Sequence, residues 1–357
     1  MRSRVFRILT AAILAGATAS TAVAMCIPFP CEDCAMRSAG QINLVVMDRE
    51  GGTVTLIPNI RFVGNAEDFT LLVPTPSVPF LEPVDTTVWD EAFAMTAPVN
   101  AQLRNDGFGC GNEDNGARFF VDPATDAEGG GGDDIVVHNR QTVAGFLAET
   151  VSASSTAALT AWMVDHGFDI TPGEAAAFGP YIERDWVFTA MLIDPQKPPT
   201  LPPGGWDNNV DPVAFVYEAD RFEVPLPILD INRESSLPMA FFIVDDHRTE
   251  LEGFTTVYAN EISRSELRAI REEFPVMGGY LDRDRFLTRL DRNFTTQDAF
   301  EADLPLRSTS DDREFRRIRS ALDSWPAVLI MLLVAVGAAQ KFLFARERFG
   351  GARRPRV

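Results

Sequence analysis

The residues with the clearest chemical potential are cysteines near the N-terminus. The stretch MCIPFPCEDC, residues 25–34, holds Cys26, Cys31 and Cys34, and the remaining cysteine of the chain is Cys110. Thiols at this spacing could ligate a metal, form a redox-active C-x-x-C dithiol, carry a lipid or form disulfides. The compartment in which the chain resides decides among these chemistries.

The first 24 residues predict export from the cytoplasm. Arg2, Arg4 and Arg7 precede a short apolar run, and small residues end the segment at Ala22 and Ala24. This arrangement is typical of a secretory signal peptide that is cleaved after Ala24. The apolar run is shorter than the roughly 20 residues that a bilayer span needs, so an uncleaved anchor is the less favoured interpretation.

A second apolar segment, residues 325–344, predicts one transmembrane helix. It begins WPAVLIMLLVAVGAA at Trp325, and its single charged residue is Lys341, whose long stem can carry the charge to the headgroups. The segment is long enough to cross a bilayer once. A buried core helix is the alternative, but the segment lacks the polar face that a core helix usually shows.

The export signal gives the chain its predicted orientation. Arginines flank residues 325–344 on both sides, so the positive-inside rule does not orient the helix. The signal peptide places the N-terminal side outside, and the helix then stops the transfer. We therefore expect an exported globular domain (25–308), a juxtamembrane segment (309–324), the membrane helix and a basic cytoplasmic tail (345–357), with the bilayer as one partner and lipid headgroups beside the basic residues.

Composition limits the classes of partner and fold. The net charge of −19 argues against nucleic-acid binding, which usually needs a basic face. Hydrophobic residues make up 46% of the chain, including 26 phenylalanines, so the exported region can bury a substantial core. We expect a globular domain that does not bind nucleic acid.

In an oxidising compartment the four cysteines favour two disulfides. Lipidation of Cys26 is disfavoured because Met25 stands where a bacterial lipobox has a small residue, and a zinc site would show a second C-x2-C knuckle. The sequence does not choose among the three possible pairings, of which we favour Cys26 with Cys31 and Cys34 with Cys110. A thiol oxidoreductase using Cys31 and Cys34 is a rival hypothesis, but such a dithiol normally opens a helix, whereas a strand is predicted after it.

Two acidic motifs could bind metal. Asp245, Asp246 and His247 supply two carboxylates and an imidazole, which suit a divalent cation; the favoured interpretation is a connection between strands whose charged residues face water. Asp282 and Asp284 form a D-x-D pair, but adjacent arginines would neutralise it, and acidic residues are also favourable at a helix start.

No nucleophile elbow, H-E-x-x-H, P-loop or EF-hand pattern is present. The sequence therefore leaves any catalytic residue unknown, and no cofactor is expected.

The expected fold class is α+β, with largely antiparallel sheets and a few packed helices, plus the C-terminal membrane helix. A hairpin is expected at 41–62, with its turn at 48–52, and a long surface loop at 104–134. Other strands are predicted at 69–73, 135–137, 186–193, 213–217, 224–229, 240–244 and 254–258, and helices at 86–96, 155–166, from 171 onwards, 265–274 and 284–290.

Several segments together resemble the bacterial domain of unknown function 2330 family. They are the C-x4-C opening at Cys26 and Cys31, GNAEDFTLLVPTPSVP, ALTAWMVDHGFDITPGEAAAFGPYIERDWVFTAMLI, PVAFVYEADRFEVPLPI and FLTRLDRNFTT, and they cover most of residues 26–308. The resemblance implies an exported bacterial protein, often with a membrane segment near the C-terminus. It implies no activity and no catalytic residue.

These observations favour a non-enzymatic module of the bacterial envelope. The expected protein is tethered to the cell membrane by one helix, and its domain, periplasmic or extracellular, binds an envelope protein or polymer. The alternatives are the thiol-disulfide oxidoreductase at Cys31 and Cys34 and a hydrolase with an unrecognised site.

Overall fold

The computed structural model describes twelve stretches of the chain. They are residues 21–23, 27–30, 36–64, 69–100, 134–168, 170–194, 196, 208–209, 211–219, 221–232, 236–316 and 318–319. All four cysteines lie outside these stretches, as do most of the predicted signal peptide, most of the predicted loop at 104–134 and the predicted membrane helix at 325–344. Among the residues that the structure describes, no helix is both long and apolar enough to cross a membrane.

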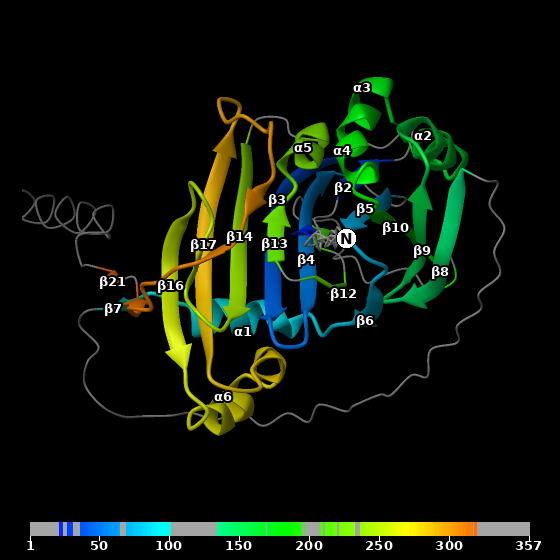
Figure 1. Ribbon diagram of the computed structural model, residues 1–357. Coiled ribbons are helices and arrows are strands. Elements are labelled where there is room, and N and C mark those ends of the chain that lie inside the picture. Colours follow the sequence, from blue (N-terminus) through cyan, green and yellow to red (C-terminus); the bar gives the residue numbers. More distant parts are fainter. Residues whose placement is uncertain are drawn as a thin grey trace, which may run out of the picture.

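A nine-stranded sheet forms one half of the described fold (Figure 1). Its order is β20-β16-β17-β14-β3-β4-β12-β6, and β11 also pairs with β4. All of these pairings are antiparallel except that of β3 with β14, which is parallel. The strands are β3 (Met36–Asp48), β4 (Thr53–Gly64), β6 (Phe80–Pro83), β11 (Asn208–Asn209), β12 (Val213–Glu218), β14 (Ser236–Asp245), β16 (Thr255–Ile262), β17 (Arg285–Thr295) and β20 (Phe315–Arg316).

A five-stranded antiparallel sheet forms the other half. Its order is β2-β5-β10-β9-β8, and short helices lie over it (Figure 1). The strands are β2 (Ile27–Pro30), β5 (Phe69–Thr75), β8 (Ile135–Val143), β9 (Phe146–Ala153) and β10 (Val187–Ile193), and the helical segments are α2 (Thr156–Asp165), α3 (Pro172–Ala175), η1 (Ala176–Phe178), α4 (Gly179–Ile182), α5 (Leu226–Leu229) and η2 (Asp230–Asn232).

Short pairings and three more helical segments complete the described fold. β1 (Thr21–Val23), β13 (Arg221–Val224) and β18 (Leu304–Pro305) make a three-stranded sheet, β15 (Thr249–Glu250) pairs with β19 (Arg307–Ser308), and β7 (Val99–Asn100) pairs with β21 (Ile318–Arg319). The helical segments are α1 (Thr87–Met95), α6 (Leu267–Glu273) and η3 (Met277–Tyr280). β1 consists of the last residues of the predicted signal peptide, and the cleavage after Ala24 stays a prediction.

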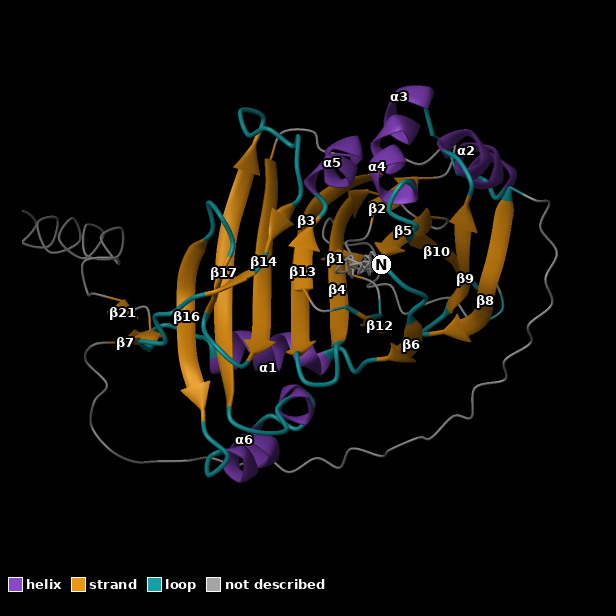
Figure 2. Ribbon diagram, in the orientation of Figure 1, coloured by secondary structure: helices purple, strands orange, loops and turns teal. Residues whose placement is uncertain are grey.

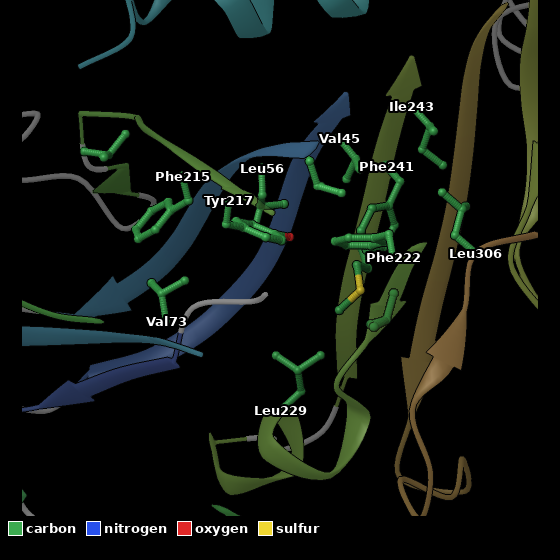
Figure 3. Packing of buried hydrophobic residues seen from close by; sticks show 14 of the residues in the cluster. Val45, Leu56, Val73, Phe215, Tyr217, Phe222, Leu229, Phe241, Ile243 and Leu306 are labelled. Carbon is green, nitrogen blue, oxygen red and sulfur yellow. The ribbon is translucent and has the colours of Figure 1, made fainter. Parts of the chain in front are cut away.

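Alternation along β14 divides the buried residues into two layers. Phe241 and Ile243 point into the core between the two large sheets, where Phe222 of β13 meets Phe241 (Figure 3). Phe242 and Val244 point to the opposite face, which α1 covers. Because both faces of this strand are buried, its sequence is a continuous apolar run rather than an alternating pattern.

Local signals place the helices that the sequence predicted. The Ser155 hydroxyl accepts a hydrogen bond from the Ala158 N–H at the start of α2, and Gly167 follows that helix with a φ of +82°. Thr171 and Glu174 form a reciprocal capping box at α3. The α+β class, the mostly antiparallel sheets and the 41–62 hairpin are confirmed.

Two predicted elements are wrong. Residues 284–290 were predicted as a helix, but 285–290 belong to β17, where Phe286, Leu287 and Leu290 are buried between β14 and β16. Such spacing fits a strand buried on both faces as well as it fits a helix. Residues 224–229, predicted as a strand, contain the end of β13 and then α5. Strands β6 and β9, and the short strands β1, β2, β7, β11, β15 and β18 to β21, are additional to the prediction.

Candidate functional site

A groove of about 1020 Å³ lies over the α1 side of the nine-stranded sheet. Its floor is formed by β3, β14, β17 and the start of β16, and Phe93 of α1 forms one wall; Figure 2 shows α1 crossing the strands near the end of β14. We call it the sheet groove, and its lining is Gly40, Gln41, Ile42, Phe93, Pro238, Met239, Ala240, Gly253, Thr255, Thr256, Val257, Arg289, Asp291, Arg292, Asn293, Asp298 and Phe315.

Arg289 is the central charged residue of the sheet groove. It donates from Nε and Nη2 to the two carboxylate oxygens of Asp291, at 2.9 and 2.8 Å. Its guanidinium carbon also lies 4.7 Å from the ring centre of Phe93 and 5.5 Å from that of Phe242. The bidentate pair and the two rings hold this cation in one position, so the groove presents a fixed polar group among apolar side chains.

A second ion pair also belongs to the lining of the groove. Arg292 donates to Asp298 at 2.7 Å, and its guanidinium carbon lies 4.1 Å from the ring centre of Phe294. The backbone N–H of Thr295 contributes most to lowering the pKa of Asp298 to about 2, and the Arg292 guanidinium and the Thr295 hydroxyl lower it further. A carboxylate with so low a pKa is ionised at neutral pH and is a poor general base.

The chemistry of the groove suits binding better than catalysis. Its lining in the described part of the chain contains no cysteine, histidine or serine, and each of its two carboxylates is paired with an arginine. A nucleophile activated by a neighbouring base is therefore missing from this lining. What the groove offers is apolar side chains and two neutralised ion pairs.

The predicted metal residues Asp245, Asp246 and His247 have different partners. Arg49 donates to both oxygens of Asp245 at 2.7 and 2.6 Å, and the His247 Nδ1 lies 2.8 Å from Asp312. Asp246 accepts from an arginine of β17 at 2.9 Å. The expectation that these charges face water is wrong for Asp245, whose side chain is 0% exposed. Within the described residues no group of three or more His, Cys, Asp and Glu side chains could hold a metal ion.

The D-x-D pair is also split between partners. Asp282 accepts from the Arg285 Nε at 3.3 Å, whereas Asp284 accepts from the Arg264 backbone N–H at 2.5 Å. Arg285 is 2% exposed and also donates to the Met47 carbonyl oxygen at 2.8 Å. This arginine connects the start of β17 to the end of β3, so the motif has a structural role.

A serine and a histidine meet in a second, smaller pocket of about 290 Å³. The His138 Nε2 lies 2.8 Å from the Ser152 hydroxyl, and the pairing of β8 with β9 is irregular between Val137 and Asn139, at His138 itself. Bulges of this kind often redirect a side chain next to an active site. Among the described residues, no carboxylate contacts the other ring nitrogen of His138.

A half-buried cluster joins α4, β13 and the residues before β18. The Tyr181 hydroxyl donates to Asp303 at 2.6 Å, and Arg184 donates to the other oxygen of Asp303 at 2.8 Å. Glu223 lies 3.7 Å from Arg184. Burial, and then the negative charge of Asp303, raise the pKa of Glu223, while Arg184 and Arg221 oppose this shift.

The sequence did not identify Arg289 and Asp291 as site residues. Their i, i+2 spacing places them on one face of a strand, and this signal was hidden because 284–290 was predicted as a helix. The four cysteines lie outside the described residues, so their pairing stays a prediction. β3 begins two residues after Cys34, so a strand follows the C-x-x-C motif, as the sequence predicted. An activated dithiol is normally followed by a helix.

One protein-family model matches most of the chain. A family model described as "Uncharacterized protein conserved in bacteria (DUF2330)" matches residues 21–307. The chain belongs to this family. No curated protein and no solved structure matches the chain. The DUF2330 match includes the sheet groove up to Asp298 and leaves Phe315 just outside it.

Removal of the buried Asp245 carboxylate will destabilise this DUF2330 domain. Asp245→Ala removes the ionic partner of the partly exposed Arg49 and the acceptor of the Asp246 backbone N–H, which costs about 2 kcal/mol. Urea unfolding of the purified chain in mild detergent measures this loss. The control is Asp311→Ala, which removes an equally close pair with the exposed Arg313 and leaves stability unchanged. Equal, small effects of the two substitutions would contradict the structural role of Asp245.

The raised pKa of Glu223 predicts a pH-dependent cost in stability. The folded DUF2330 domain holds this proton more tightly than the unfolded chain, so stability is lost as the pH rises from the ordinary value of 4.5 through the raised one. Glu223→Gln removes the ionisation, and the variant should therefore gain stability over the wild type as the pH rises. Thermal unfolding at pH 4 and pH 8 measures both chains, and a difference between them that does not change with pH would contradict the prediction.

Proposed function

We propose that this protein is a membrane-anchored, extracytoplasmic binding module of the bacterial envelope. The signal peptide and the apolar segment at 325–344 support the location, and the sheet groove supports the binding role. Its occupant is an envelope protein or polymer. The paired state of both groove carboxylates is the observation that carries this proposal, because it leaves a shaped surface and no general base.

The shape of the groove favours an extended occupant over a compact one. Its floor is the surface of a sheet, formed by neighbouring strands from β3 to β16, and glycine at positions 40 and 253 leaves parts of the rim without side chains. Ile42 and Ala240 are neighbours on β3 and β14, and Asp291, which pairs with Arg289, lies opposite Ala240 on β17. A chain molecule with apolar and polar groups in succession, such as a polypeptide or an envelope polymer, matches this pattern.

A large side chain introduced into the sheet groove should prevent the occupant from binding. Thr255 is exposed and lines the groove, so Thr255→Trp places a large ring over the floor without entering the core. The control is Thr142→Trp, at an exposed position of β8 in the other large sheet. The readout is recovery of crosslinked proteins and polymers with the tagged full chain from intact envelopes. We expect at least a tenfold loss for the groove variant, about 1.4 kcal/mol of binding.

Two results would contradict this role. Equal recovery of partners by both tryptophan variants would place binding elsewhere on the domain. Repeated recovery of no partner and no polymer by the wild-type chain would remove the binding proposal itself.

A second candidate function is hydrolysis at the contact between Ser152 and His138. Their 2.8 Å separation is that of a nucleophile and its general base. If the pair is catalytic, the purified chain should cleave an activated ester, and Ser152→Ala and His138→Ala should each reduce the rate at least about 100-fold. Rates for these variants equal to the wild type, or no cleavage above background, would identify the contact as a cross-strand hydrogen bond.

A further inference from the structure

The last described strands of the chain lie along one edge of the nine-stranded sheet. Phe315 and Arg316 of β20 pair with Ala259 and Tyr258 of β16, the outermost long strand. After Arg317, β21 leaves this edge and pairs with β7 (Figure 1). Residues 315–316 and 318–319, which come before the predicted membrane helix, are thus paired with strands of the domain.

The tether between this edge and the predicted membrane helix is short. Residues 320–324 separate β21 from the apolar segment at 325–344. Fully extended, the connection spans only about 20 Å. A domain of about 280 residues has a radius of gyration of about 19 Å, so the β16 edge stands at the bilayer when the helix is inserted. The opposite edge of the sheet, β6, lies roughly 30 Å away across the strands.

The chemistry of this edge suits a lipid surface. The stretch REFRRIR, residues 313–319, carries four arginines and one glutamate, in a chain whose net charge is −19. Phe315 is 40% exposed and the Arg313 side chain is 86% exposed, with Asp311 as its partner at 2.7 Å. The Arg316 guanidinium carbon lies 5.3 Å from the ring centre of Tyr258. An exposed aromatic residue among arginines is the composition by which peripheral segments enter the headgroup region.

We propose that the edge formed by β20 and residues 313–316 rests on an anionic lipid surface, with Phe315 in the headgroup region. This inference deepens the proposed membrane anchoring and depends on it. Because Phe315 also lines the sheet groove, the groove opens beside the bilayer and takes an occupant that lies close to the membrane.

Photocrosslinking of the full chain in lipid nanodiscs tests this placement. Benzoylphenylalanine replaces Phe315 in one chain and Phe80 in the other; Phe80 lies on β6 and is 48% exposed, so it is a matched control at the far edge. The discs contain phosphatidylcholine with phosphatidylglycerol, or phosphatidylcholine alone, and mass spectrometry identifies the adducts. Alkaline carbonate extraction of membranes checks first that the chain is anchored.

The expected result is lipid adducts at position 315 and background levels at position 80. Neutral discs should give about fivefold fewer adducts at position 315, because one arginine near an anionic surface increases membrane affinity by about that factor. Equal adducts at both positions, or none at position 315 in a chain that carbonate does not extract, would overturn the lipid contact while leaving the anchor in place. Protein adducts at position 315 would identify a protein interface and also overturn it. Release of the chain by carbonate would overturn the anchor itself.

Discussion

The parallel pairing of β3 with β14 holds the nine-stranded sheet together. It joins β6, β12 and β4 on one side to β17, β16 and β20 on the other. At the start of β3, Gly40 has a φ of +136°, and a Cβ there would lie 2.7 Å from the Pro238 carbonyl oxygen, so the approach requires glycine. At the other end, the buried Asp245 pairs with Arg49 in the hairpin turn. At one end of the β3–β14 pairing the strands are held by this ion pair. The other end, near Gly40, forms part of the sheet groove.

This division explains where the proposed binding surface lies on the sheet. Alpha helix α1 covers one face of the sheet where Phe242 and Val244 are buried, and the same face beyond Phe93 is the groove. Its charges are paired within the domain, so specificity for an occupant rests on shape and apolar contact more than on net charge. If the β20 edge rests on the membrane, as we propose, the groove would bind molecules at the bilayer surface.

Local signals in the sequence predicted much of the fold. The predictions that failed concern residues whose surroundings depend on contacts between distant parts of the sequence. The hairpin at 41–62 and the helices predicted at 155–166 and from 171 onwards depend on neighbouring residues, and all are present. β17 was predicted wrongly because burial between two strands overrides a spacing that also fits a helix. The groove was missed for the same reason, since Arg289 and Asp291 share a face only in a strand. Asp245 was expected in water because its partner, Arg49, is distant in sequence.

Amide hydrogen exchange in native membranes tests the central claim, that the sheet groove is a binding surface in the envelope. Exchange of Thr255–Val257 at the sheet edge is compared between envelope vesicles and the purified chain in detergent, with the surface helix α2 as an internal reference. A bound occupant predicts slower exchange at the groove in vesicles, with α2 unchanged. Identical exchange at the groove in both preparations would contradict the claim.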